Sequence, residues 1–145
     1  MTPPYSPTPR PADPGLTGAA LEESMRWLAP VGTTTREVVL PVALAGVHLP
    51  RGARIAAVLS SANRDAARWA NADEFDIDRP PKAHRAFGTG PHFCVGHRLA
   101  RYEQRIPLEM LFERLPDLRL DPEQRAEIAG WEFRGPRRLP VVWDP

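Results

Sequence analysis

The strongest periodic pattern of apolar residues begins at residue 95 and runs to residue 110. The apolar positions recur at spacings of four, three, four and four, and they are Val95, Leu99, Tyr102, Ile106 and Met110. Such spacing places them on one face of an α-helix, so we expect a helix here with that face in the core. Pro107 lies inside the pattern and lacks the N–H that a helix interior needs, so we expect the helix to end near Arg105.

A second helical pattern lies near the start of the chain. Thr17 is a good N-cap, and apolar residues then share one face as far as about Ala29, where Pro30 closes the helix. We expect a further short helix over residues 64–69, capped by Asn63, and an irregular stretch over residues 70–86.

Short runs of β-branched and apolar residues predict strands between and after these helices. The runs cover residues 36–44, 47–49, 53–59, 118–120 and 139–143. Pro41 lies inside the first run, which indicates an edge strand or a break there. Two longer helices, small sheets and much irregular chain therefore predict an α+β fold.

Composition divides the chain into a tail and one domain. Residues 1–16 hold six prolines and few apolar side chains, so we expect a flexible, proline-rich tail followed by a domain over residues 17–145. The formal net charge is +1, which indicates neither nucleic acid nor an anionic membrane as a partner. The chain has no apolar run of membrane-spanning length and a single cysteine, so we expect a cytoplasmic protein without an internal disulfide.

That cysteine, Cys94, lies on a glycine-rich loop directly before the strongest helical pattern. The unpaired N–H groups at a helix N-terminus favour a thiolate over a thiol. Glycines at 88, 90 and 96 leave room for a large flat ligand, Phe87 can cover the sulfur, and His92 can donate to an acidic group at the ligand's edge. A heme whose iron takes a cysteine thiolate makes these demands.

The segment Phe87–Gly96 resembles the heme-binding signature of the cytochrome P450 (heme-thiolate monooxygenase) superfamily. All six signature positions match, and they are Phe87, Gly88, Gly90, His92, Cys94 and Gly96. The resemblance implies heme b (iron protoporphyrin) as the cofactor and Cys94 as the ligand of its iron. It also implies that His92 and Arg36 hold the heme propionates, and it assigns no catalytic residue beyond the iron ligand.

A second motif of the same family precedes the loop. Glu23 and Arg26 resemble its Glu-x-x-Arg motif and lie on one helix face, where they can pair and reach a third partner. In relatives an arginine of the irregular meander often joins this pair, but Glu74 occupies that position here, so Arg79 is the nearest substitute. The resemblance implies that these three residues are structural.

The resemblance extends from about residue 19 to the C-terminus. Further matches in family order are Pro30-Val31, Gly46-Val47, Pro50, Gly52, Ala62-Asn63-Arg64-Asp65 and Leu139-Pro140-Val141. The chain therefore resembles the C-terminal, heme-proximal third of a bacterial, mainly α P450 fold. We find no counterpart of the long distal helix, which carries an acid–alcohol pair for oxygen activation in relatives.

Other kinds of site could use the same residues. A zinc site could draw on His84, His92, Cys94 and His97, but it would leave Phe87 and the glycines without a role. A thiol hydrolase would need Cys94 to meet His92 or His97 on one short loop, which is unusual for a nucleophile and its base. The glycines lack the spacing of a dinucleotide-binding fingerprint.

Two functions remain as expectations. The first is a monooxygenase portion that takes a small hydrophobic substrate and receives electrons from a ferredoxin-type donor, with Arg98, Arg101 and Arg105 offering it a basic surface. The second is a truncated, non-catalytic heme-binding or interaction remnant. Uncovered helix faces would favour self-association or a complementing chain.

Overall fold

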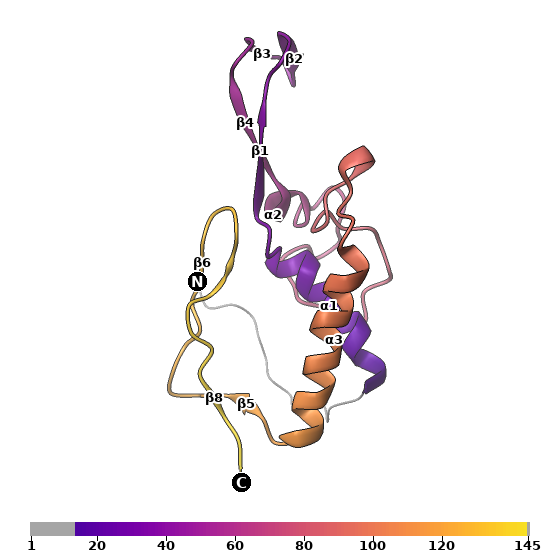
Figure 1. The fold of residues 1–145 in the computed structure, drawn as a ribbon, viewed down its shortest axis with the longest axis vertical. Coiled ribbons are helices and arrows are strands. Elements are labelled where there is room, and N and C mark those ends of the chain that lie inside the picture. The colour runs from indigo at the N-terminus through magenta and orange to yellow at the C-terminus, as the bar shows by residue number, and fades with distance from the viewer. Residues whose placement is uncertain (1–13, 145) are drawn as a thin grey trace.

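Two helices form the body of the molecule in this computed structural model, which describes residues 14–144. Helices α1 (Pro14–Leu28) and α3 (His97–Arg114) lie side by side and contact each other (Figure 1). Every sheet is a two-stranded antiparallel pair, and much of the remaining described chain is irregular. Residues 1–13, which hold most of the predicted tail, lie outside the described residues.

Helix α1 begins at Pro14, so the predicted start at Thr17 is wrong by three residues. Proline is well suited to the first helical position because the N–H that it lacks would be unpaired there in any case. The helix ends after Leu28 because Ala29 adopts a left-handed conformation, with φ of 46°. The N–H of Ala29 then donates to the Met25 carbonyl at 3.2 Å, and Pro30 cannot continue the helix.

Helix α3 runs through Pro107 to Arg114, so the predicted end near Arg105 is wrong. The proline removes only one hydrogen bond, that to the Glu103 carbonyl, while Leu108 and Phe112 beyond it are half-buried. Their packing favours continuation of the helix over the conformations that would end it.

Replacement of Pro107 by alanine is expected to stabilise the protein, by up to about 3 kcal/mol, because it restores the N–H donor and removes the ring. Urea denaturation followed by circular dichroism measures the change. Pro116→Ala is the control, since Pro116 is exposed and follows the end of α3. A loss of stability in the Pro107 variant would show that the native packing requires the proline.

The apolar face of α3 does not lie in a core of this chain, which corrects the prediction. Val95, Leu99, Tyr102, Ile106 and Met110 are all exposed, Val95 completely. Helix α1 instead contacts the neighbouring face, where the Gln104 amide donates to the Met25 sulfur at 3.8 Å. The apolar stripe is therefore left without a partner among the described residues.

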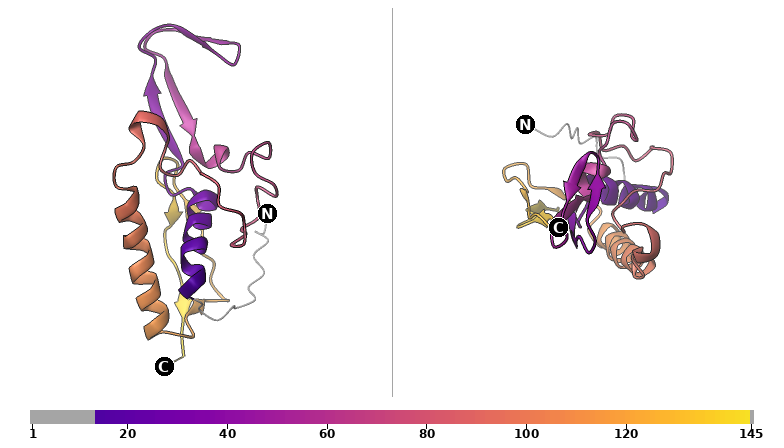
Figure 2. Two further views of the ribbon diagram at one scale, coloured as in Figure 1. Left: turned by 90° about the vertical axis from the view of Figure 1, so that its right-hand side faces the viewer. Right: turned by 90° about the horizontal axis from the view of Figure 1, so that it is seen from above.

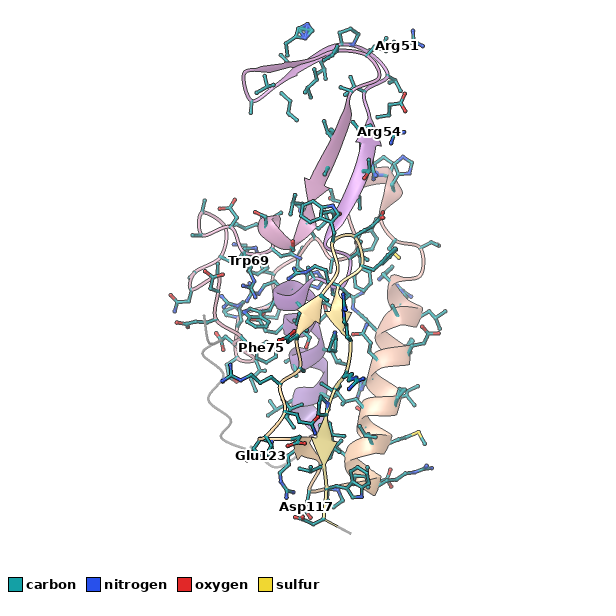
Figure 3. The ribbon with its side chains drawn as sticks, turned by 90° about the vertical axis from the view of Figure 1, so that its left-hand side faces the viewer. Arg51, Arg54, Trp69, Phe75, Asp117 and Glu123 are labelled. Carbon is teal, nitrogen blue, oxygen red and sulfur yellow. The ribbon has the colours of Figure 1, made fainter. Side chains whose placement is uncertain are left out.

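A long antiparallel hairpin projects away from the helices (Figures 1 and 2). Strand β1 (Thr33–Glu37) pairs with β4 (Arg54–Val58), and β2 (Val42–Leu44) pairs with β3 (Val47–Leu49) at the tip. The predicted strand over residues 36–44 is divided between β1 and β2, and the break contains Pro41, as expected. Strands β3 and β4 agree with the predicted runs. Figure 3 shows the basic side chains of Arg51 and Arg54 on this hairpin.

The segment after β4 differs from the prediction. Helix α2 covers Leu59–Ala62, and Asn63 is its C-cap rather than the N-cap of a helix over residues 64–69. The Asp65 carboxylate accepts the Ala67 N–H at 2.9 Å, and this side-chain bond stabilises a turn in place of the helix.

Two small strand pairs complete the fold. β5 (Arg119–Leu120) pairs with β8 (Val141–Val142), both inside predicted runs. β6 (Ile128–Ala129) and β7 (Gly135–Pro136) were not predicted, because two-residue strands carry no alternation in the sequence.

The buried interior is small and unusually polar. Its hydrophobic members are Met25, Ala29, Val38, Trp69, Ala72 and Ala86. The largest side chains that are completely buried are those of Arg26 and Asn63. The centre of this fold is therefore a hydrogen-bonded arginine rather than a cluster of large apolar side chains.

Candidate functional site

The Cys94 loop connects a short 3₁₀ turn, η1 (Gly90–His92), to the start of α3. The Cys94 N–H donates to the Phe87 carbonyl at 3.0 Å, and the Cys94 carbonyl accepts the His97 N–H at 3.3 Å. The loop therefore folds back on itself and continues directly into the helix. The Cys94 side chain is exposed and free.

Glycine is required at two points of this loop by the backbone. Gly88 and Gly90 have φ of +74° and +72°, a left-handed region that strains other residues. Gly96 has no positive φ, and what matters there is the room that it leaves, because a Cβ would lie 3.9 Å from the Cys94 sulfur. Because glycine has no Cβ, the surface beside the sulfur is open.

The aromatic side chains of the loop pack against one another and against His97 at the start of α3. The Phe87 ring lies 6.3 Å from that of Phe93 and 6.2 Å from that of His97, both edge to face, while Phe93 and His97 are 4.9 Å apart. Phe93 is partly exposed and Val95 completely so. An open thiol surrounded by apolar surface is suited to a flat, largely apolar metal complex.

The N-terminus of α3 is open to an anion. Gly96 is the N-cap, and no side chain caps the first turn. Apart from the His97 N–H, which donates to the Cys94 carbonyl, the N–H groups of that turn have no side-chain cap and lie close to Cys94, where they favour a thiolate.

The two predicted propionate partners are exposed. His92 ends η1, and the Arg36 side chain on β1 donates to the Thr35 carbonyl at 2.9 Å. Neither side chain forms an ion pair with another described residue. Both can therefore receive a carboxylate without breaking an existing ion pair.

Arg26 of α1 uses all five of its N–H donors within the protein. It binds Glu23 through two hydrogen bonds of 2.7 Å each, from Nε and Nη2. Its remaining donors reach the backbone carbonyls of Asn63 at 2.9 Å, Ala72 at 2.8 Å and Glu74 at 2.8 Å. Complete pairing offsets the cost of burying a guanidinium that is only 1% exposed.

Glu23 forms the other half of this network. It accepts the Asp76 N–H at 2.9 Å and Nε of Arg79 at 3.2 Å. Burial on its own raises the pKa of Glu23, but the hydrogen bonds from Arg26, Asp76 and Arg79 outweigh it and hold that pKa below its usual value. The structure thus places Arg79 against the Glu23–Arg26 pair, while Glu74 contributes its backbone carbonyl to Arg26.

A second hydrogen-bonded group of polar side chains, Glu22 with His84 and Arg101, could not be predicted from the sequence. Glu22, beside Glu23 on α1, binds His84 before the Cys94 loop and Arg101 after it. No local signal identifies these partners, because they lie 62 and 79 residues away from Glu22.

The alternative sites find no support in the geometry. Within residues 14–144, no group of three or more His, Cys, Asp or Glu side chains could hold a metal ion, so His84, His92, Cys94 and His97 do not form a zinc cluster. The Cys94 sulfur has no hydrogen bond to a described histidine, as a thiol hydrolase would need. No helix of the described region is long and apolar enough to cross a bilayer.

Comparison with known proteins gives consistent matches. The family model described as "Cytochrome P450" matches residues 15–127. The chain is 40% identical over 135 residues to the steroid C26-monooxygenase of Mycolicibacterium smegmatis, covering 92% of this chain and 34% of that protein. It is 44% identical over 135 residues to the mycinamicin IV hydroxylase/epoxidase of Micromonospora griseorubida, covering 90% and 34%.

Solved structures agree. The post-tailoring hydroxylase HmtN of himastatin biosynthesis superposes with a TM-score of 0.84 at 40% identity, over 92% of this chain and 36% of that one. P450BioI, solved in complex with a fatty-acid-ligated acyl carrier protein, superposes with a TM-score of 0.81 at 37% identity, over 91% and 34%. The chain spans about a third of the length of the curated relatives that it matches.

Proposed function

Because this chain belongs to the cytochrome P450 family, we propose that it forms the heme-proximal part of a monooxygenase that inserts one oxygen atom into a small organic molecule. Heme b is the cofactor of the family. The observation that carries the proposal is the Cys94 loop, with its exposed sulfur, its left-handed glycines and the uncapped helix end beside it. The monooxygenase names of the relatives favour this function over a non-catalytic remnant.

The chain's residues fit heme in four ways. Cys94 would ligate the iron as a thiolate, which the N-terminus of α3 stabilises. Gly96 leaves the surface beside the sulfur open, and Phe87 would cover the sulfur from one side, with its ring packed against His97. His92 and Arg36 would bind the propionates through exposed donors. When bound, heme supplies the electron-transfer and oxygen chemistry, and the thiolate tunes it by donating electron density to the iron.

The substrate pocket would be completed by polypeptide outside the described residues. The apolar stripe of α3, Val95, Leu99, Tyr102, Ile106 and Met110, is exposed over its whole length. An apolar surface of this extent is normally covered by another segment or another chain. The relatives' names favour a small hydrophobic organic substrate, such as a steroid.

The surface proposed for a ferredoxin-type donor has less unpaired positive charge than the sequence indicated. Arg101 is paired with Glu22 and Arg105 with Glu109, so part of the expected positive charge is neutralised. Arg98 has no ion-pair partner among the described residues and is exposed. We therefore assign the attraction for an acidic donor mainly to Arg98, with a smaller share for its neighbours.

Titration of the purified protein with heme tests the proposed cofactor site. We expect one heme per chain and, after reduction and exposure to carbon monoxide, the red-shifted Soret band of a thiolate-ligated ferrous complex. A band of the histidine-ligated type, or no saturable binding, would contradict the proposal.

A further inference from the structure

Glu22 joins the two ends of the Cys94 loop. One carboxylate oxygen receives Nε2 of His84, at 3.1 Å, and Nη2 of Arg101, at 3.0 Å, while the other oxygen receives Nε of Arg101. His84 lies ten residues before Cys94 in the sequence, and Arg101 lies seven residues after it. A single side chain of α1 therefore fixes both the entry to the loop and its exit.

Before the Cys94 loop, Glu22 binds one particular tautomer of the His84 ring. Its Nδ1 accepts the Ala86 N–H at 3.2 Å, and a backbone N–H can only donate, so Nδ1 carries no proton. The proton must then be on Nε2, which donates to Glu22. Burial lowers the pKa of His84 and outweighs the opposing effect of the Glu22 carboxylate, in agreement with a neutral ring.

The exit is held through Arg101. Its Nη1 donates to Nδ1 of His97 at 2.9 Å and to the His97 carbonyl at 3.1 Å, and His97 opens α3. The Arg101 guanidinium also lies 4.5 Å from the centre of the Phe87 ring, as a cation–π contact. The Phe87 carbonyl in turn accepts the Cys94 N–H. A short series of contacts thus leads from Glu22 to the backbone of the cysteine.

We propose that Glu22 is a positioning residue, which holds the Cys94 loop in its ligand-binding conformation by binding His84 and Arg101 together. That this conformation serves ligand binding rests on the proposed function. Its test needs no heme, so its failure can be distinguished from failure of the proposed cofactor site.

The test is amide hydrogen exchange of the heme-free 145-residue protein, resolved by residue with NMR. In Glu22→Ala we expect the amides of Cys94 and Ala86 to exchange about fivefold faster or more, because the bonds that close the loop lose their anchor. The Ala29 amide, which closes α1, should keep its rate. A general loss of stability would instead make the amides of Cys94, Ala86 and Ala29 all exchange faster.

Matched variants complete the test. Glu109→Ala removes the ion pair with Arg105 on α3, the helix that also carries Arg101, and should leave the loop amides unchanged. Glu22→Gln retains one of the two acceptor oxygens and removes the charge, so it should give an intermediate rate, which also provides a measurement if the alanine variant folds poorly. The double variant Glu22→Ala/His84→Ala should exchange at Cys94, whose N–H donates to Phe87 and not to His84, no faster than Glu22→Ala alone. Unchanged loop exchange, or equal acceleration throughout the chain, would overturn the proposal.

Discussion

Replacement of Glu23 by alanine is expected to lower the free energy of unfolding by about 3 to 5 kcal/mol, the cost of leaving a buried charge without its partner. Arg26 would remain in an interior site that is 1% exposed and would lose two of its five hydrogen bonds. Arg79 and the Asp76 N–H would lose the same acceptor. Because the fold has few large apolar side chains at its centre, the loss affects its most enclosed region.

Urea denaturation of the heme-free protein measures this effect. Glu113→Ala is the matched control, since Glu113 is an exposed helical glutamate on α3, and its replacement should change stability by no more than about 0.5 kcal/mol. If the two variants were equally stable, the Glu23–Arg26 pair would contribute little to the fold.

The contribution of the Glu23–Arg26 network to the free energy of unfolding depends on pH. The pKa of Glu23 in the folded protein lies below its ordinary value of 4.5, so its contribution to stability is complete above about that pH. The contribution is lost as pH falls through the lower, folded-state value. The difference in unfolding free energy between wild type and Glu23→Gln should therefore shrink on acidification below pH 4.5.

Replacement of Cys94 by alanine is expected to abolish the thiolate-type carbonyl spectrum completely. Cys94 is the only cysteine of the chain, so no second thiol can take its place. The loop backbone should survive the change, because its closing bond uses the Cys94 N–H and not the side chain. Absorption spectroscopy of the reduced, carbon monoxide-treated protein provides the measurement.

His92→Ala serves as the companion variant to Cys94→Ala. It removes a proposed propionate contact and should weaken heme retention while leaving the thiolate-type band in the protein that still binds. If Cys94→Ala gave the wild-type spectrum, the iron ligand would be another residue and the assignment of this loop would be wrong.

Local signals in the sequence predicted most of the elements. Apolar spacing identified both long helices, and Pro41 marked the interruption of the first strand run. The predictions were wrong where packing or a side-chain hydrogen bond outweighed the local sequence signal. Pro107 suggested a helix end, yet packing beyond it keeps α3 continuous, and Asp65 forms a turn where a helix over residues 64–69 was expected.

The candidate site was only partly accessible to sequence reasoning. The Cys94 loop is contiguous, so its glycines and aromatic residues could be interpreted together. Arg79 was identified because it is the nearest arginine to an expected position. Glu22 could not be assigned, because its role depends on contacts with His84 and Arg101 that only the folded chain brings about.

The carbonyl groups that surround Arg26 also set an order of events in folding. Its pairing with Glu23 is local and can form as soon as α1 is helical. Its other acceptors lie 37, 46 and 48 residues further along the chain, so they arrive only after the hairpin and the meander have closed a long loop. We therefore expect the interior to form only after residue 74 has docked, and contacts of such long range slow folding.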